Sequence, residues 1–169
     1  MFTLRYQPPY DWPWMLRFLG DRAVAGIEEV SETRYRRTLA IGAHQGWFSV
    51  TPHPEDATLA LTLSDGLLPV ADEVQARVAR LFDLRFDPAP MLETLGPLAA
   101  ARPGLRLPGS VDVFEQGVRA ILGQLVSVAM AAKLTGKGGE LLGEPRADAP
   151  GFICFPTAET MAQADPTAL

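Results

Sequence analysis

Four short runs with the composition of β-strands follow one another between residues 27 and 63, and the links between them are brief. The runs are Ile27–Ser31, Tyr35–Gly42, Gly46–Pro52 and Thr58–Leu63. The last of them, TLALTL, alternates strictly, as a strand with one buried face does. Because short links join antiparallel neighbours and parallel strands need a long crossover, the pattern predicts an antiparallel sheet.

Two helices and one further strand are expected to complete this unit. FTLRY, Phe2–Tyr6, alternates like a strand, and Asp11 can cap a helix over Trp12–Gly20. A second helix after Pro69 places apolar residues on one stripe. These residues are Val70, Val74, Val78, Leu81 and Phe82. Residues 1–88 are therefore predicted to form an α+β domain, an antiparallel sheet with helices on one face.

No strand pattern appears after Phe86, so residues 89–169 are expected to form the start of an all-α domain. LETLGPLAA, residues 92–100, is a short helix candidate, and a last helix is expected from Thr157 to the Asp165-Pro166 step. Between them lie two longer helices. The second is expected to weaken over TGKGGELLG, residues 135–143, because each glycine there disfavours helix by about 1 kcal/mol relative to alanine.

The two longer helices meet at GQLVS, Gly123–Ser127. Glycine is common just past a helix end and serine is a good N-cap, so the pattern predicts a sharp junction. A large apolar side chain, Leu125, stands at this corner beside Gln124. Two interpretations are open. Leu125 packs under the next helix, or it is a wedge of the kind that DNA-bending proteins insert between stacked bases.

Aromatic residues gather around the first predicted helix. They are Tyr10, Trp12, Trp14 and Phe18. One interpretation is core packing between this helix and the sheet. The other is that one face of the cluster lines a pocket for a flat, electron-poor ligand, which aromatic rings attract.

Composition restricts the remaining functions. The formal net charge is −5, which argues against nonspecific nucleic-acid binding, so any contact with DNA requires a local surface. A single cysteine, Cys154, excludes an internal disulfide and favours the cytoplasm. The sequence has no apolar run long enough to span a membrane, and its N-terminus lacks the pattern of a signal peptide.

The usual catalytic constellations are missing. His44 and His53 lie near turns without a cysteine close by, and solvated loop histidines are the simpler interpretation than a metal site. Cys154, flanked by Ile153 and Phe155, is expected to be a buried thiol rather than a nucleophile. No phosphate loop or dinucleotide fingerprint occurs, so neither a metal nor a cofactor is expected.

Several long segments carry a resemblance to a known family. They are YQPPYDWPWML, LFDL, RPGLRLPG, VDVFEQGVRAILGQLVSVAMAAKL and ICFPT. They resemble the bacterial inducible 3-methyladenine DNA glycosylases of type II, in the helix-hairpin-helix DNA glycosylase superfamily. The likeness runs in register over essentially the whole chain.

The resemblance implies base-excision repair by base flipping, in which the N-glycosidic bond of an alkylated base is hydrolysed in double-stranded DNA. It assigns Leu125 as the intercalating wedge, with Gln124 beside it, and Phe18 as a residue lining the base pocket. The family's catalytic aspartate follows a hairpin with a Gly-Pro-Gly-type turn, which residues 1–169 lack. We therefore expect an N-terminal portion, inactive alone and monomeric.

Two alternatives stay open at this point. The chain could be a non-catalytic DNA- or protein-binding module, in which Leu125 belongs to an interface. It could also be a small-ligand sensor that uses the aromatic cleft.

Overall fold

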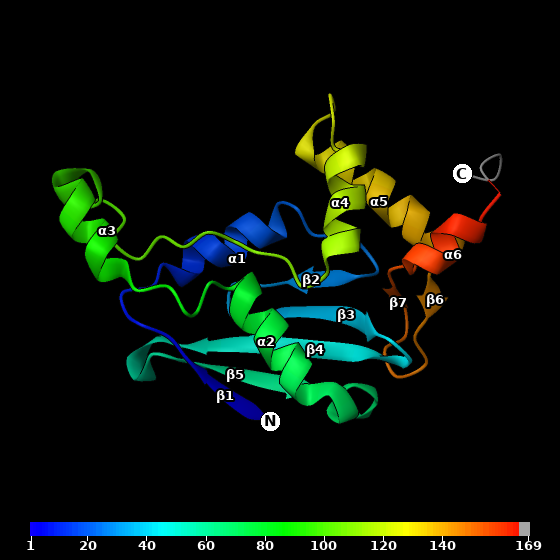
Figure 1. Ribbon diagram of the computed structural model, residues 1–169, viewed down its shortest axis with the longest axis horizontal. Helices are drawn as coiled ribbons and strands as arrows, with labels where there is room; N and C mark the ends of the chain where they lie inside the picture. The colour runs from blue at the N-terminus through cyan, green and yellow to red at the C-terminus, as the bar shows by residue number, and fades with distance from the viewer. Residues whose placement is uncertain (166–169) are drawn as a thin grey trace.

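The computed structural model describes residues 1–165 and has a five-stranded antiparallel sheet at its centre (Figure 1). Its strands stand in the order β1-β5-β4-β3-β2. They are β1 Phe2–Arg5, β2 Glu28–Val30, β3 Tyr35–Ile41, β4 His44–His53 and β5 Thr58–Leu63. Every neighbouring pair is antiparallel, as the short links predict.

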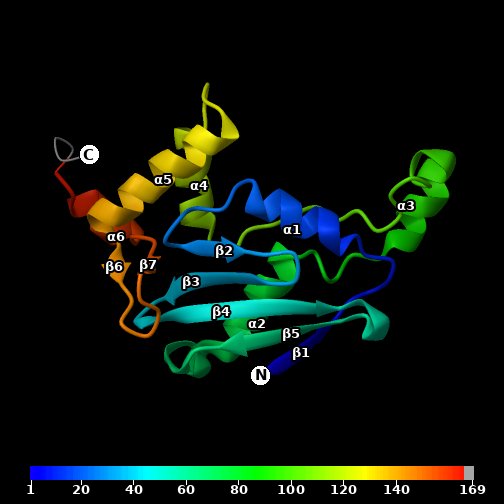
Figure 2. The same cartoon turned by 180° about the vertical axis from the view of Figure 1, so that it is seen from behind.

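One face of this sheet is covered by two helices, α1 (Trp12–Gly20) and α2 (Ala71–Leu81). The register aligns Tyr35 with Val50 and Val50 with Leu61, so the three side chains share a face, and all are buried. Met15 of α1 and Val78 of α2 belong to the same core cluster. Figure 1 shows α2 in front of the sheet, and Figure 2 shows it behind the strands. The α+β prediction is confirmed.

The ends of these two helices follow from local chemistry. The Asp11 carboxylate accepts a hydrogen bond from the Trp14 backbone N–H at 3.1 Å, which satisfies a donor that the first turn leaves free. Before α2, a 3-10 helix spans Asp65–Val70, and a shorter 3-10 turn, Pro54–Asp56, precedes β5. Phe82 lies just past the end of α2 and is fully buried.

After α2 the chain forms α3 (Pro88–Leu95) and a 3-10 turn (Gly96–Leu98), which stand apart from the body at one end (Figure 1). The sequence predicts a helix over residues 92–100, and this prediction misplaces its start. The Asp87 carboxylate accepts from the Ala89 N–H at 3.0 Å, and Pro88 fits the first helical position. The prolines therefore begin this helix and do not interrupt it.

The segment from residue 102 to 111 then returns along α1 and α2. The Asp11 N–H donates to the Gly104 carbonyl at 2.8 Å, and the Gly109 N–H donates to the Leu81 carbonyl at 2.9 Å. The buried Arg106 guanidinium donates to the carbonyls of Gln7 and Pro9. We call this segment, residues 102–111, the strap; it connects α3 and its 3-10 turn to α4. The division into domains 1–88 and 89–169 stays a prediction.

The remaining described elements are two helices, a short hairpin and a last helix. They are α4 Val113–Leu122, α5 Val128–Leu142, β6 Glu144–Pro145, β7 Ile153–Cys154 and α6 Ala158–Gln163. Thr157 caps α6 by accepting from the Thr160 N–H, as expected. The predicted stop reaches Pro166, which lies outside the described residues, as do residues 167–169. Within residues 1–165, no helix combines the length and apolarity of a membrane span.

Helix α5 continues through its glycines, so the predicted weakening at residues 135–143 is wrong. Gly136 and Gly139 are buried. A Cβ atom on Gly139 would lie 2.9 Å from the Cδ1 atom of Ile153, and one on Gly136 would lie 3.6 Å from Val24 Cγ1. The glycines let α5 pack closely against the residues before β2 and against β7. This packing offsets their poor helix propensity.

The expectation of no strand after residue 100 is also wrong, because β6 and β7 form an antiparallel pair. Each has two residues, too few to display an alternating pattern. Their support comes from elsewhere in the chain. The Ile153 N–H donates to the Gly26 carbonyl at 2.8 Å, and the Thr38 hydroxyl donates to the Ile153 carbonyl at 2.5 Å.

Candidate DNA-binding junction and base pocket

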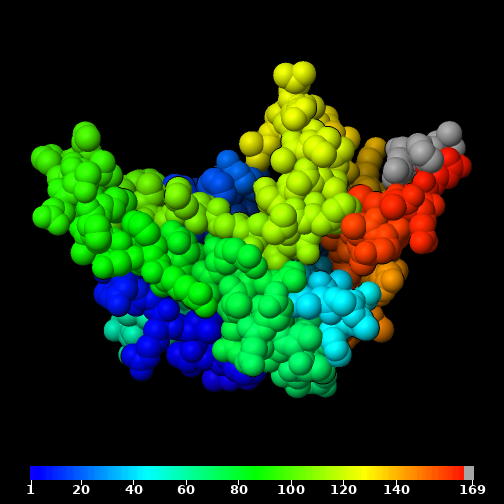
Figure 3. Space-filling view, viewed as in Figure 1, coloured from blue at the N-terminus to red at the C-terminus, as the bar shows by residue number. Residues whose placement is uncertain are grey.

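The junction between α4 and α5 projects from the molecule as its yellow tip in Figure 3. Ser127 caps α5 by accepting from the Met130 N–H at 3.2 Å, as predicted. Gly123 keeps a right-handed conformation, and Leu125 has a φ of 62°, in the left-handed region that non-glycine residues seldom adopt. Its relative exposure is 106%, so the interpretation of Leu125 as a residue packed under the next helix is wrong.

A cavity of about 330 Å³ opens beside this junction. Its walls come from α1, α4, α5, the strand β3 and the strap around residues 108–111. Phe18, Gly123 and Val126 are among its lining residues, whereas Gln124 and Leu125 stand outside it and are exposed. The structure therefore brings the three residues singled out in the sequence to one place, with Phe18 in the wall and the other two next to Gly123 and Val126.

The aromatic cluster separates into two groups. Trp12 is buried, stacks on Tyr10 with 3.8 Å between ring centroids, and donates from Nε1 to the Tyr6 hydroxyl at 3.1 Å. These rings belong to the core. Trp14 and Phe18 lie on another side of α1, with ring centroids 5.3 Å apart. Core packing thus holds for Trp12 and Tyr10, whereas Phe18 lines the cavity and its role toward a flat ligand stays a prediction.

The turn after α1 places a cation, Arg22, over the ring of Phe18. The Arg22 guanidinium carbon lies 3.7 Å from the centroid of Phe18, and its Nη1 atom donates to the Phe18 carbonyl at 3.2 Å. Trp14 and Phe18 are four residues apart and share one side of α1, and Arg22, two residues past the end of the helix, lies over Phe18. Arg22 also lines the cavity.

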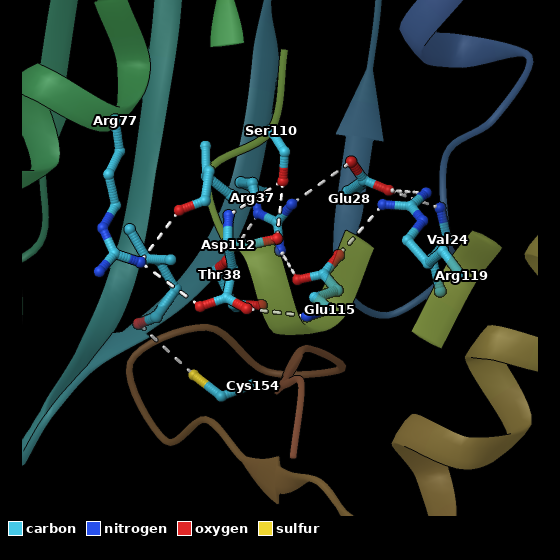
Figure 4. A network of polar contacts seen from close by, with 12 residues as sticks. Val24, Glu28, Arg37, Thr38, Arg77, Ser110, Asp112, Glu115, Arg119 and Cys154 are labelled. Carbon is cyan, nitrogen blue, oxygen red and sulfur yellow. Dashed lines mark hydrogen bonds and ion pairs between the residues drawn. The ribbon is translucent and has the colours of Figure 1, made fainter. Parts of the chain in front are cut away.

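A cluster of four charged residues lines the cavity and links α4 to the sheet (Figure 4). Arg37 from β3 contacts Glu115 at 2.5 Å and Glu28 at 3.7 Å. Arg119 from α4 contacts Glu28 at 2.9 Å and Glu115 at 3.1 Å. The two glutamates and Arg37 are almost completely buried. Their mutual pairing is what makes this burial tolerable, because an isolated buried charge is very unfavourable.

The environment of Glu28 explains why it stays ionised. Burial alone would raise the pKa of its carboxyl group, but Arg37 and Arg119 outweigh burial, and the pKa lies below its ordinary value. The Tyr35 hydroxyl donates to Glu28 at 2.7 Å, and burial together with that carboxylate raises the pKa of Tyr35. Each glutamate is held by two arginines.

The remaining candidates from the sequence take no part in this site. Cys154 is buried and its Sγ atom lies 3.7 Å from the Leu39 carbonyl oxygen; burial raises the pKa of its thiol. His53 Nδ1 lies 3.7 Å from a carboxylate oxygen of Glu55 at an exposed position. Among the described residues, no group of three or more histidine, cysteine, aspartate or glutamate side chains could hold a metal ion.

The model of the AlkA N-terminal domain matches residues 1–112, which is more than half of the sequence. The chain belongs to this family. DNA-3-methyladenine glycosylase 2 of Escherichia coli strain K12 is 57% identical over all 169 residues, and the match covers 60% of that relative. A probable bifunctional transcriptional activator/DNA repair enzyme AlkA of Mycobacterium tuberculosis is 35% identical over 96% of the chain and 34% of its own length.

A solved structure, the 3-methyladenine DNA glycosylase from Archaeoglobus fulgidus, has the same fold. It superimposes with a TM-score of 0.81 over 99% of this chain and 60% of its own, at 20% identity. The chain thus spans about three fifths of the length of the E. coli relative and of this structure. The family resemblance read from the sequence is confirmed.

Sequence reasoning missed the charge cluster and Arg22. The members of the cluster, Glu28, Arg37, Glu115 and Arg119, are far apart in the sequence. Only the Glu115–Arg119 pair carries a local signal, the four-residue spacing of a helical ion pair. For Arg22, the signal was its spacing of four residues from Phe18, which repeats the spacing between Trp14 and Phe18.

Proposed function

We propose that this protein takes part in DNA base-excision repair as a glycosylase that hydrolyses the N-glycosidic bond of alkylated bases of the 3-methyladenine type. One observation carries the proposal: a fully exposed leucine at the tip of a helix junction, next to a cavity with an aromatic wall. Its DNA-repair relatives support it. Its partner is double-stranded DNA, and we infer a monomer in the cytoplasm, where the single buried Cys154 stays reduced.

In this mechanism the flipped nucleotide enters the cavity and Leu125 fills the space it leaves in the base stack. Unstacking a base costs a few kcal/mol, and an inserted apolar side chain offsets part of that cost. Gln124 is exposed at the same corner. The left-handed backbone of Leu125 holds its side chain outward before DNA arrives, which lowers the cost of ordering it on binding.

Alkylation at a ring nitrogen gives the base a positive charge, and this charge has two effects. It favours stacking on the face of Phe18 by cation–π attraction. It also weakens the glycosidic bond, so that the remaining task is to stabilise the positive sugar and assist water. Glu28 and Glu115 line the cavity but are held by arginines. We assign no catalytic residue within this chain and propose that the 169 residues alone do not release the base.

The test compares Leu125→Ala with Ile121→Ala in the complete protein. Ile121 is an exposed apolar residue one turn earlier, on α4, and is the matched control. We expect Leu125→Ala to slow excision of 3-methyladenine from a well-paired duplex more than from single-stranded DNA, where little stacking must be broken. Ile121→Ala should leave both rates unchanged, and both variants should keep the melting temperature.

Equal losses on the two substrates would show that Leu125 is not a wedge. Release of the base by the 169-residue chain alone would show that a carboxylate within it is catalytic. If the complete protein binds DNA but cleaves no alkylated base, the non-catalytic binding module replaces the glycosylase.

A further inference from the structure

The charges of the residues that line the cavity do not sum to zero. Three are arginines, Arg22, Arg37 and Arg119, and two are glutamates, Glu28 and Glu115. Arg37 and Arg119 each contact both glutamates, so these four form a neutral group. No ion pair joins Arg22 to any carboxylate within the described residues. Arg22 therefore contributes the excess positive charge of the cavity wall.

That charge sits on the surface a cationic base would use. The guanidinium carbon of Arg22 lies 3.7 Å from the Phe18 ring centroid, the geometry of a cation–π contact. The hydrogen bond from Nη1 to the Phe18 carbonyl keeps the group there, and the Arg22 carbonyl accepts from Arg119 at 2.6 Å, which fixes the backbone beneath it. A positively charged base must displace Arg22 from the ring or stay beside it against like-charge repulsion.

We propose that Arg22 is a specificity-determining residue of this cavity: it occupies the cation-binding face of Phe18 and so lowers the preference for positively charged bases relative to neutral ones. This inference rests on the proposed function. Both kinds of base stack on an aromatic ring, but only the cation competes with the guanidinium for the electrostatic part of the attraction. Arg22 thereby makes the excision rates of cationic and neutral damaged bases more similar.

The experiment measures single-turnover excision by the complete protein from two duplexes of the same sequence. One carries an N7-methylated guanine, which has a fixed positive charge, and the other carries hypoxanthine, a neutral purine. The readout is the ratio of the cationic rate to the neutral rate. Arg22→Met removes the charge and keeps a long unbranched side chain, and Arg22→Lys keeps the charge. Arg17→Met is the matched control, because Arg17 is an exposed arginine of α1 that does not line the cavity.

We expect Arg22→Met to raise the ratio about three- to tenfold, the effect of one partly buried cation–π contact. Arg22→Lys should leave the ratio close to that of the wild type. Arg17→Met should slow both reactions equally, by weakening general attraction to DNA, and leave the ratio unchanged. An unchanged or lower ratio in Arg22→Met would overturn the proposal. Equal losses of both rates would indicate instead that Arg22 holds a DNA phosphate.

Failure of the proposed function would look different, because the wild type would then excise neither base. The charge preference of the cavity is still measurable in that case. Trp14 lies beside Phe18, so quenching of tryptophan fluorescence by an N7-methylated guanine nucleoside and by inosine compares a cationic with a neutral ligand. Arg22→Met should tighten binding of the first relative to the second, and equal affinities before and after the substitution would contradict the inference.

Discussion

Helices α2 and α4 are both amphipathic, yet they are attached to the molecule in opposite ways. The apolar stripe of α2, Val74, Val78 and Leu81, is buried against the sheet. On α4 the buried residue is a glutamate, Glu115, while apolar side chains such as Val113 and Ile121 are exposed. The first helix is held by the hydrophobic effect and the second by ion pairs to Arg37 and Glu28.

The difference shows what each helix does for the site. Apolar packing is strong but tolerant of small shifts, whereas a buried network of charges fixes distances and directions closely. Helix α4 carries the junction with Leu125 at its end, so its position relative to the cavity matters. Val113 and Ile121 of α4 are exposed, as is Leu125 at the junction that follows this helix.

The largest effect is expected from breaking the ion pairs of α4. Glu115→Ala leaves the buried Arg37 with Glu28, at the longer distance, as its one carboxylate partner among the described residues, and removing one partner of a buried pair costs about 3–5 kcal/mol of unfolding free energy. Urea denaturation measures it. Glu159→Ala, at an exposed position on α6, is the control. A loss below about 1 kcal/mol would mean that apolar contacts hold α4 after all.

A pair of leucine and isoleucine truncations sharpens the contrast. Leu81→Ala in α2 should lower the unfolding free energy by about 2–5 kcal/mol because it opens a cavity in the core. Ile121→Ala in α4, where the side chain is 69% exposed, should change it by no more than about 0.5 kcal/mol. Similar losses at the two positions would remove the distinction between the helices.

The charge cluster should also make stability depend on pH at the acid end. The folded-state pKa of Glu28 is lowered below its ordinary value of 4.5, so its contribution is fully present above that value. It is lost as the pH falls through the lower pKa of the folded state. Unfolding curves of the wild type should therefore shift more between neutral and strongly acidic pH than those of Glu28→Gln. Parallel shifts would exclude Glu28 as a source of acid sensitivity.

The smallest effect concerns the junction. Leu125→Gly should raise the unfolding free energy by up to about 1 kcal/mol. The left-handed conformation costs leucine about 1–2 kcal/mol, and glycine adopts it without this cost. Part of the gain is offset because glycine loses more chain entropy on folding. Leu125→Ala, with the same backbone restriction, should be nearly neutral. Thermal melting distinguishes them, and a loss as large as that of Leu81→Ala would place Leu125 in a core.

The sequence predicted the sheet and the helix caps because their signals are local. Strand alternation, short links and the side chains of Asp11, Ser127 and Thr157 depend on residues a few positions apart. The glycine and the capping serine also predicted the junction, while the roles of Leu125, Gln124 and Phe18 toward DNA come from the family resemblance and stay predictions. That Leu125 is exposed was one of two open interpretations until the fold decided between them.

The features that the sequence failed to predict all depend on distant contacts. Helix α5 continues through its glycines because Gly139 packs against Ile153. Strand β7 is held in place by hydrogen bonds to Gly26 and Thr38. The Arg37–Glu115 pair joins residues 78 positions apart. No periodicity within a segment reports such contacts, because they join residues that are far apart in the sequence.

These long separations also set an order of assembly on the ribosome. The sheet with α1 and α2 is complete once residue 84 has emerged, because its strands pair with near neighbours along the chain or, for β1, with β5. The hydrogen bond from Ile153 to Gly26 joins residues even further apart than the bond from Thr38 to Ile153, which spans 115 residues, and it closes the largest loop among these contacts. Since closing a loop costs entropy that grows with its length, the β6–β7 hairpin docks last. The nascent chain therefore presents a finished sheet to which the helices of the junction are added.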